Sequence, residues 1–77
     1  MKIINDYGIF SGELDYFLLV FEQKSINAAA RKISQDSAHI SRSILKLETR
    51  VGGNLFSRHK NGLTPTPLGE HLYRSLN

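Results

Sequence analysis

Residues 25–56 constrain the fold most, because they hold two short amphipathic segments separated by a break. The first segment is rich in small and apolar residues, at Ala28, Ala29, Ala30 and Ile33. Ser34-Gln35-Asp36 then interrupts the pattern, and the second segment continues to Gly52, where a helix is expected to end. Two helices joined by a tight turn are the unit with which many proteins read the major groove of DNA.

Helical periodicity divides the second segment, about residues 36–51, into two faces. Asp36 is the expected N-cap, because its carboxylate can accept hydrogen bonds from the first free backbone N–H groups. The inward stripe consists of Ile40, Ile44, Leu47 and Val51. The outer face then carries Ala38, His39, Arg42, Leu45, Lys46 and Thr49, with Ser37 and Ser41 toward its edges.

The outer face supplies the candidate contacts to DNA. Arg42 is the candidate for a base edge, because its planar fork can bond guanine O6 and N7 together. The other candidates near the start of this helix are Ser37, Ala38, His39 and Ser41, and Lys46 is expected to meet phosphate. Asn27, at the start of the first segment, is a further candidate. For Leu45 three interpretations stay open: a thymine methyl, a protein partner, or an ordinary exposed leucine.

The flanking segments complete a mainly α fold. A helix is expected from Ser11, whose hydroxyl can cap it, to about Gln23, with its apolar positions at Leu14, Phe17, Leu18, Val20 and Phe21. The next helix starts at Ser25 or Asn27, both good caps. Residues 1–10 are expected to form a strand or an ordered arm.

Residues 56–66 place basic side chains around an Asn61-Gly62 turn signal and predict a β-hairpin wing. Arg58, His59 and Lys60 either reach the DNA backbone or the minor groove, or serve solubility alone. Thr66 and Pro67 are expected to start a last helix over residues 67–77. Its stripe of Leu68, Leu72 and Leu76 covers the domain's own core or pairs with a second subunit, and we favour the core.

Charge and composition agree with a small DNA-binding domain. The net charge is +3, and residues 24–60 carry eight of the ten lysines and arginines but two of the seven acidic residues. A polyanion is the partner that such a basic stretch favours, although a solvated basic surface is the alternative. Without cysteine or a membrane-length apolar run, the 77 residues are expected to form one cytoplasmic domain.

No catalytic, cofactor-binding or metal site is expected. Asp36, His39 and Ser41 lie close in sequence, but on one helix their side chains diverge. The three histidines lack the spacing of a zinc site. Glu48 is interpreted as a hydrogen-bond or ion-pair partner between helices.

The order of residues resembles the N-terminal winged helix-turn-helix domain of the LysR-type transcriptional regulators. The resemblance covers about residues 14–69. It rests on Leu14 and Phe17, on Ser25-Ile26-Asn27-Ala28-Ala29-Ala30 with Ile33, on Ile40-Ser41-Arg42 with Ile44, on Leu47-Glu48, Val51-Gly52 and Leu55-Phe56 with Arg58, and on Thr66-Pro67-Leu68-Gly69. Such a series in order is a specific signal.

The resemblance implies a sequence-specific binder of double-stranded DNA, with the third helix in the major groove and the wing on the flank. It also implies a last helix that lengthens into a dimerising linker, so a homodimer or heterodimer is possible. Asp36-Ser37-Ala38 stands where the family usually has Ser-Gln-Pro, and Leu45 stands where it usually has a basic or polar residue. The family's effector-binding domain is not in this sequence, so no small-molecule effector site is expected. The alternative is a protein-interaction module that pairs with or antagonises a related regulator.

Overall fold

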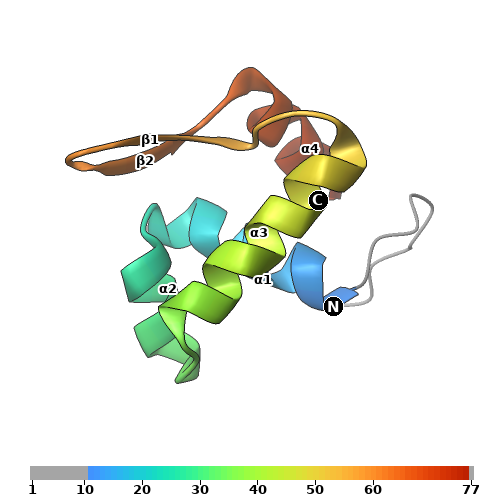
Figure 1. Cartoon of the computed structure of the whole chain (residues 1–77). Coiled ribbons are helices and arrows are strands. Elements are labelled where there is room, and N and C mark those ends of the chain that lie inside the picture. Colours follow the sequence, from blue (N-terminus) through green and yellow to red (C-terminus); the bar gives the residue numbers. More distant parts are fainter. Residues whose placement is uncertain (1–10, 77) are drawn as a thin grey trace.

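A computed structural model describes residues 11–76, and Ser11 by its backbone alone. Its elements follow the chain as α1 (Ser11–Gln23), α2 (Ile26–Ile33), α3 (Ser37–Val51), β1 (Phe56–His59), β2 (Gly62–Pro65) and α4 (Pro67–Leu76) (Figure 1). This is the mainly α winged helix-turn-helix fold that the sequence predicts. The predicted arm or strand over residues 1–10 lies outside the described residues.

The core lies between the first three helices. α1 packs against both α2 and α3, and α2 packs against α3. Most of the largest fully buried side chains come from α1 and α3, and they include Leu14, Phe17, Ile40, Ile44 and Leu47. Burying each of them stabilises the fold by about 1.5–3 kcal/mol. α2 contributes Ala29 and Ala30, whose small side chains allow the helices to approach closely.

Local chemistry sets the ends of α2 and the start of α3. Ser25 is the N-cap of α2, and its hydroxyl oxygen accepts a hydrogen bond from the Ala28 N–H at 3.1 Å. Ser34 ends α2 in the left-handed region, with φ of 56°. Asp36 caps α3 as predicted, and its carboxylate accepts from the Ala38 N–H at 3.2 Å. Asn27 is therefore not the cap and is free to project from α2.

The wing is an antiparallel hairpin in which Phe56 pairs with Pro65 and Arg58 pairs with Leu63. It projects beyond the helices above α2 (Figure 1). Lys60 and Asn61 form the connecting turn, while Gly62 already belongs to β2 and has a φ of 130°. Phe56 and Leu63 are buried, and the Phe56 ring lies 5.6 Å from that of Phe17. These contacts fix the base of the wing to the helices.

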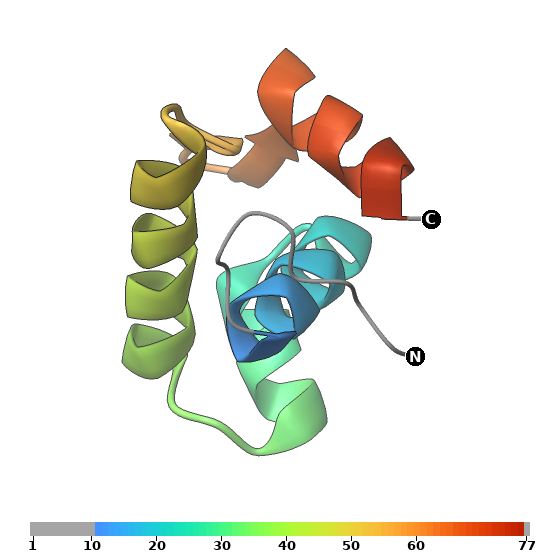
Figure 2. The same cartoon turned by 90° about the vertical axis from the view of Figure 1, so that its right-hand side faces the viewer.

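α4 lies at the opposite edge of the molecule from α3 in the view of Figure 2. Thr66 caps it, because its hydroxyl oxygen accepts from the Gly69 N–H at 3.1 Å. Leu72 is buried, and Leu68 and Leu76 are partly buried against the same core. The preference for the domain's own core is therefore confirmed, while pairing with a second subunit stays a prediction.

Ile33 is 39% exposed, because it is the last residue of α2, directly before the turn that leads away to α3. One expectation from the sequence needs correction. Glu48 bonds to a loop and not to another helix: its Oε2 accepts a hydrogen bond from the Leu55 N–H at 2.8 Å. None of the helices within residues 11–76 is long and apolar enough to cross a membrane.

Candidate nucleic-acid interface

The outer face of α3 carries the predicted contact residues. Ala38, His39, Arg42 and Lys46 are exposed, whereas Ser37 and Ser41 are half-buried at the edges of that face. Ile40, Ile44 and Leu47 on the opposite side are fully buried, so the rotation of α3 about its axis is fixed. Leu45 is 53% exposed, as predicted for an outward position.

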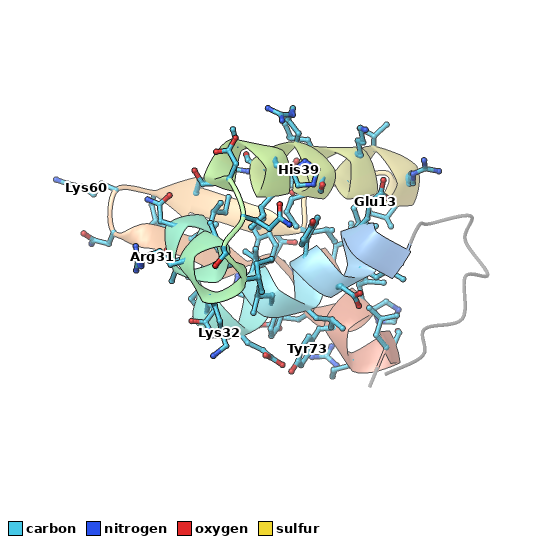
Figure 3. The ribbon with its side chains drawn as sticks, turned by 90° about the horizontal axis from the view of Figure 1, so that it is seen from below. Glu13, Arg31, Lys32, His39, Lys60 and Tyr73 are labelled. Atoms are coloured by element: carbon cyan, nitrogen blue, oxygen red, sulfur yellow. The ribbon has the colours of Figure 1, made fainter. Side chains whose placement is uncertain are left out.

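His39 lies at the border between α3 and α1. Its ring meets the ring of Tyr16 edge-on, with 5.4 Å between the centroids. Figure 3 shows the His39 side chain on the α1 side of α3. His39 is therefore exposed to a ligand but supported on one side, whereas Arg42 and Lys46 extend into solvent.

An ion pair is a second contact between α3 and α1. The Arg50 Nε atom lies 3.4 Å from Oε1 of Glu13, a carboxylate that is almost completely buried. Arg50 therefore belongs to the contact between these two helices. Arg42 and Lys46, for which no such ion pair is found within the described part of the chain, keep their charge available on the outer face.

An open groove of about 640 Å³ lies between α2 and the start of α3. Its lining includes two predicted residues, Asn27 and Ser37, and also Arg31, Ser34 and Gln35. Arg31 was missed by the sequence reasoning, although it stands one helical turn after Asn27 and therefore shares its face. Figure 3 shows Arg31 and Lys60 pointing to the same side of the molecule, whereas Lys32 points elsewhere.

The three basic residues of the wing do not share one face. Arg58 and Leu63 are partners across the hairpin, so their side chains lie on the same side of it. Because Leu63 is buried, Arg58 is on the side that faces the helices, and its Nη2 donates to the Ser41 Oγ of α3 at 3.5 Å. His59 is on the other side, and Lys60 is exposed at the tip.

No group of three or more potential metal ligands is present within residues 11–76. The exposed side chains over α2, α3 and the wing are rich in basic groups, with hydrogen-bond donors along α3. They suit a groove lined with acceptors and phosphates.

Comparison with known proteins decides the family. Residues 12–70 match the family described as bacterial regulatory helix-turn-helix protein, lysR family. The chain belongs to the LysR family. The transcriptional regulator HdfR of Yersinia enterocolitica is 37% identical to it over 59 residues, which are 77% of this chain and 20% of HdfR. This LysR-family chain therefore spans about a fifth of the length of its curated relatives.

Solved structures of the same family share the fold. The DNA-binding domain of BenM, in complex with DNA of catB site 1, superposes with a TM-score of 0.78 and 33% identity, covering 83% of this chain and 72% of that one. Corynebacterium glutamicum OxyR in a hydrogen-peroxide-bound form gives a TM-score of 0.84 at 29% identity, covering 88% of this chain and 21% of that one. The match thus covers most of the BenM DNA-binding domain and about a fifth of the OxyR chain.

Proposed function

We propose that this chain binds double-stranded DNA sequence-specifically, as the DNA-binding part of a LysR-type transcriptional regulator. The observation that carries the proposal is the outer face of α3, where Arg42 and Lys46 are exposed directly opposite a fully buried stripe. A helix so anchored fits the major groove with its basic side outward. Family membership favours this function over a pure protein-interaction module.

The residues divide by what they meet on the duplex. Arg42 reads a base edge, and Ser37, Ala38, His39 and Ser41 are its neighbours at the start of α3. Lys46 contacts phosphate, as do Asn27 and Arg31 beside the groove between α2 and α3. On the flank, Lys60 and His59 reach the backbone or the minor groove, while Arg58 stands between wing and helix.

At the scale of the regulator, we propose control of transcription in the cytoplasm by binding and not by catalysis. Pairing of two copies through α4 would place two recognition helices on neighbouring half-sites. The partly exposed side chains of Leu68 and Leu76 support that pairing, because they leave apolar surface at one edge of α4. A single recognition helix buries only about 600–1,000 Å² of protein surface, so pairing would strengthen binding considerably.

The test is a fluorescence-anisotropy titration of duplexes enriched from a random pool, compared with random duplex at two salt concentrations. Arg42→Ala is expected to weaken the best site about 5- to 100-fold and to relax the preference at one base pair. Arg74→Ala is the matched control, because Arg74 lies on α4 and pairs with Glu70 there. Equal affinity for all sequences, unaffected by Arg42→Ala, would refute the proposal.

A further inference from the structure

Three hydroxyl groups, two on α3 and one on α4, form hydrogen bonds in different ways. Thr49 donates to the Leu45 carbonyl of its own helix at 3.1 Å, and Ser75 donates to the His71 carbonyl at 2.9 Å. Ser41 instead accepts: the guanidinium of Arg58 donates to its Oγ at 3.5 Å. Within residues 11–76 no acceptor is found for the Ser41 hydroxyl proton.

The register of the wing places the Arg58 side chain beside Ser41. Phe56, Arg58 and Leu63 share the side of the hairpin that faces the helices, and two of these three side chains are buried in the core. A shift of one residue would turn Arg58 to the solvent side. The position of the guanidinium beside α3 is therefore a consequence of how the wing is anchored.

The chemistry of the two groups gives the contact a direction. Arginine has donors and no acceptor, whereas a serine hydroxyl has one donor and two acceptor lone pairs. A positive charge 3.5 Å from Oγ turns the lone pairs toward the guanidinium and the proton away from it. The Ser41 hydroxyl is thereby prepared to donate from the edge of the α3 outer face.

We propose that Arg58 is a positioning residue that fixes Ser41 as a hydrogen-bond donor toward DNA. This inference rests on the proposed function and adds the polarity of one contact to it. The partner on DNA is an acceptor: a phosphate oxygen, or guanine O6 or N7, adenine N7 or thymine O4 in the major groove. The amino groups of adenine and cytosine are donors and therefore cannot accept the Ser41 proton.

The test is a double-mutant cycle with a 77-residue chain and its best enriched duplex. In the wild-type background, Ser41→Ala is expected to weaken binding about 3- to 10-fold, the range of one hydrogen bond. In the Arg58→Met background the same substitution should change the affinity less than about 2-fold, because the hydroxyl is no longer oriented. Arg58→Lys retains a cationic donor, so in that background Ser41→Ala should again weaken binding almost as much as in the wild type.

Lys60→Met is the matched control background, since it also removes a wing cation but one at the exposed tip. There Ser41→Ala should cost as much as in the wild type. Melting temperatures verify that each variant is folded, and Arg58→Ala replaces Arg58→Met if the latter melts early. Selecting duplexes from a random pool with the Ser41→Ala variant shows which acceptor is involved. A relaxed preference at one base pair indicates a base, and an equal loss of affinity for all sequences indicates a phosphate.

Two results would overturn the inference while leaving DNA recognition intact: an equal cost of Ser41→Ala with and without Arg58, or no cost in the wild type. Indifference of the wild-type chain to sequence is a different result. It would contradict the proposed function itself, and this inference with it.

Discussion

Glu48 shows how one carboxylate closes the corner between α3 and the wing. Leu55 is fully buried in that corner, where its N–H donates to Glu48 and its carbonyl accepts from the Thr66 N–H at 3.0 Å. Both backbone groups of a buried residue are thus paired, which a fold of this size requires. The sequence indicated a structural role for Glu48 but not its partner, because the path of a loop depends on tertiary packing.

Removing this acceptor should therefore be costly. Glu48→Ala leaves the Leu55 N–H unpaired, and we expect the free energy of unfolding to fall by about 1–3 kcal/mol in urea denaturation. Glu48→Gln keeps an oxygen acceptor and should lose less. The comparison variant is Glu70→Ala, which removes an exposed carboxylate with a 4.0 Å ion pair and should cost below about 0.5 kcal/mol. Similar losses for Glu48→Ala and Glu70→Ala would contradict this account.

The ends of a helix were predictable where residues next to each other in the sequence determine them. Ser25, Asp36 and Gly52 stand at the ends of α2 and α3, and each acts through its own backbone neighbourhood. The contact between α4 and the segment before β1 was not predictable, because it joins residues distant in sequence. A side chain built at Gly69 would collide with the carbonyl of Leu55, so α4 packs here directly against backbone.

This close approach gives a prediction for α4 as an element. Gly69→Ala forces α4 away from Leu55 and should lower the free energy of unfolding by about 1–3 kcal/mol, as overpacking does. Gly12→Ala in α1 is the control, since nothing lies within 4 Å of the added methyl group. There the same exchange should raise the free energy of unfolding by about 0.4–1 kcal/mol, because alanine lowers the conformational entropy of the unfolded chain. Thermal melting that shifts in the same direction for both variants would refute the packing argument.

Over the whole molecule, the basic side chains of residues 24–60 point to different sides. Arg50 pairs with Glu13 inside the helix contact, and Arg58 turns toward α3. Arg31 and Lys60 point together to one side, and Lys32 points away from them (Figure 3). The sequence predicted the excess of positive charge and the outer face of α3. It did not predict the directions of these side chains, because the side of the wing that faces the helices depends on how the wing packs against the core.

Salt dependence should separate the two neighbouring cations of α2. If Arg31 meets a phosphate, Arg31→Met lowers the slope of log affinity against log salt concentration by about one. Lys32→Met should leave that slope unchanged, although both residues are exposed and adjacent in the chain. Neither substitution should alter the preferred sequence. Equal slopes for the two variants would show that α2 adds only diffuse attraction.

The two sides of the wing also differ in how freely they can change over evolution. Phe56, Arg58 and Leu63 contact the body of the domain, so replacements there require matching changes in α1 or α3. Ser57, His59 and Thr64 share the other side and are exposed. Descendants of this chain can therefore exchange these three residues singly while every intermediate still folds. Flank preference is the trait that we expect to diverge first between lineages.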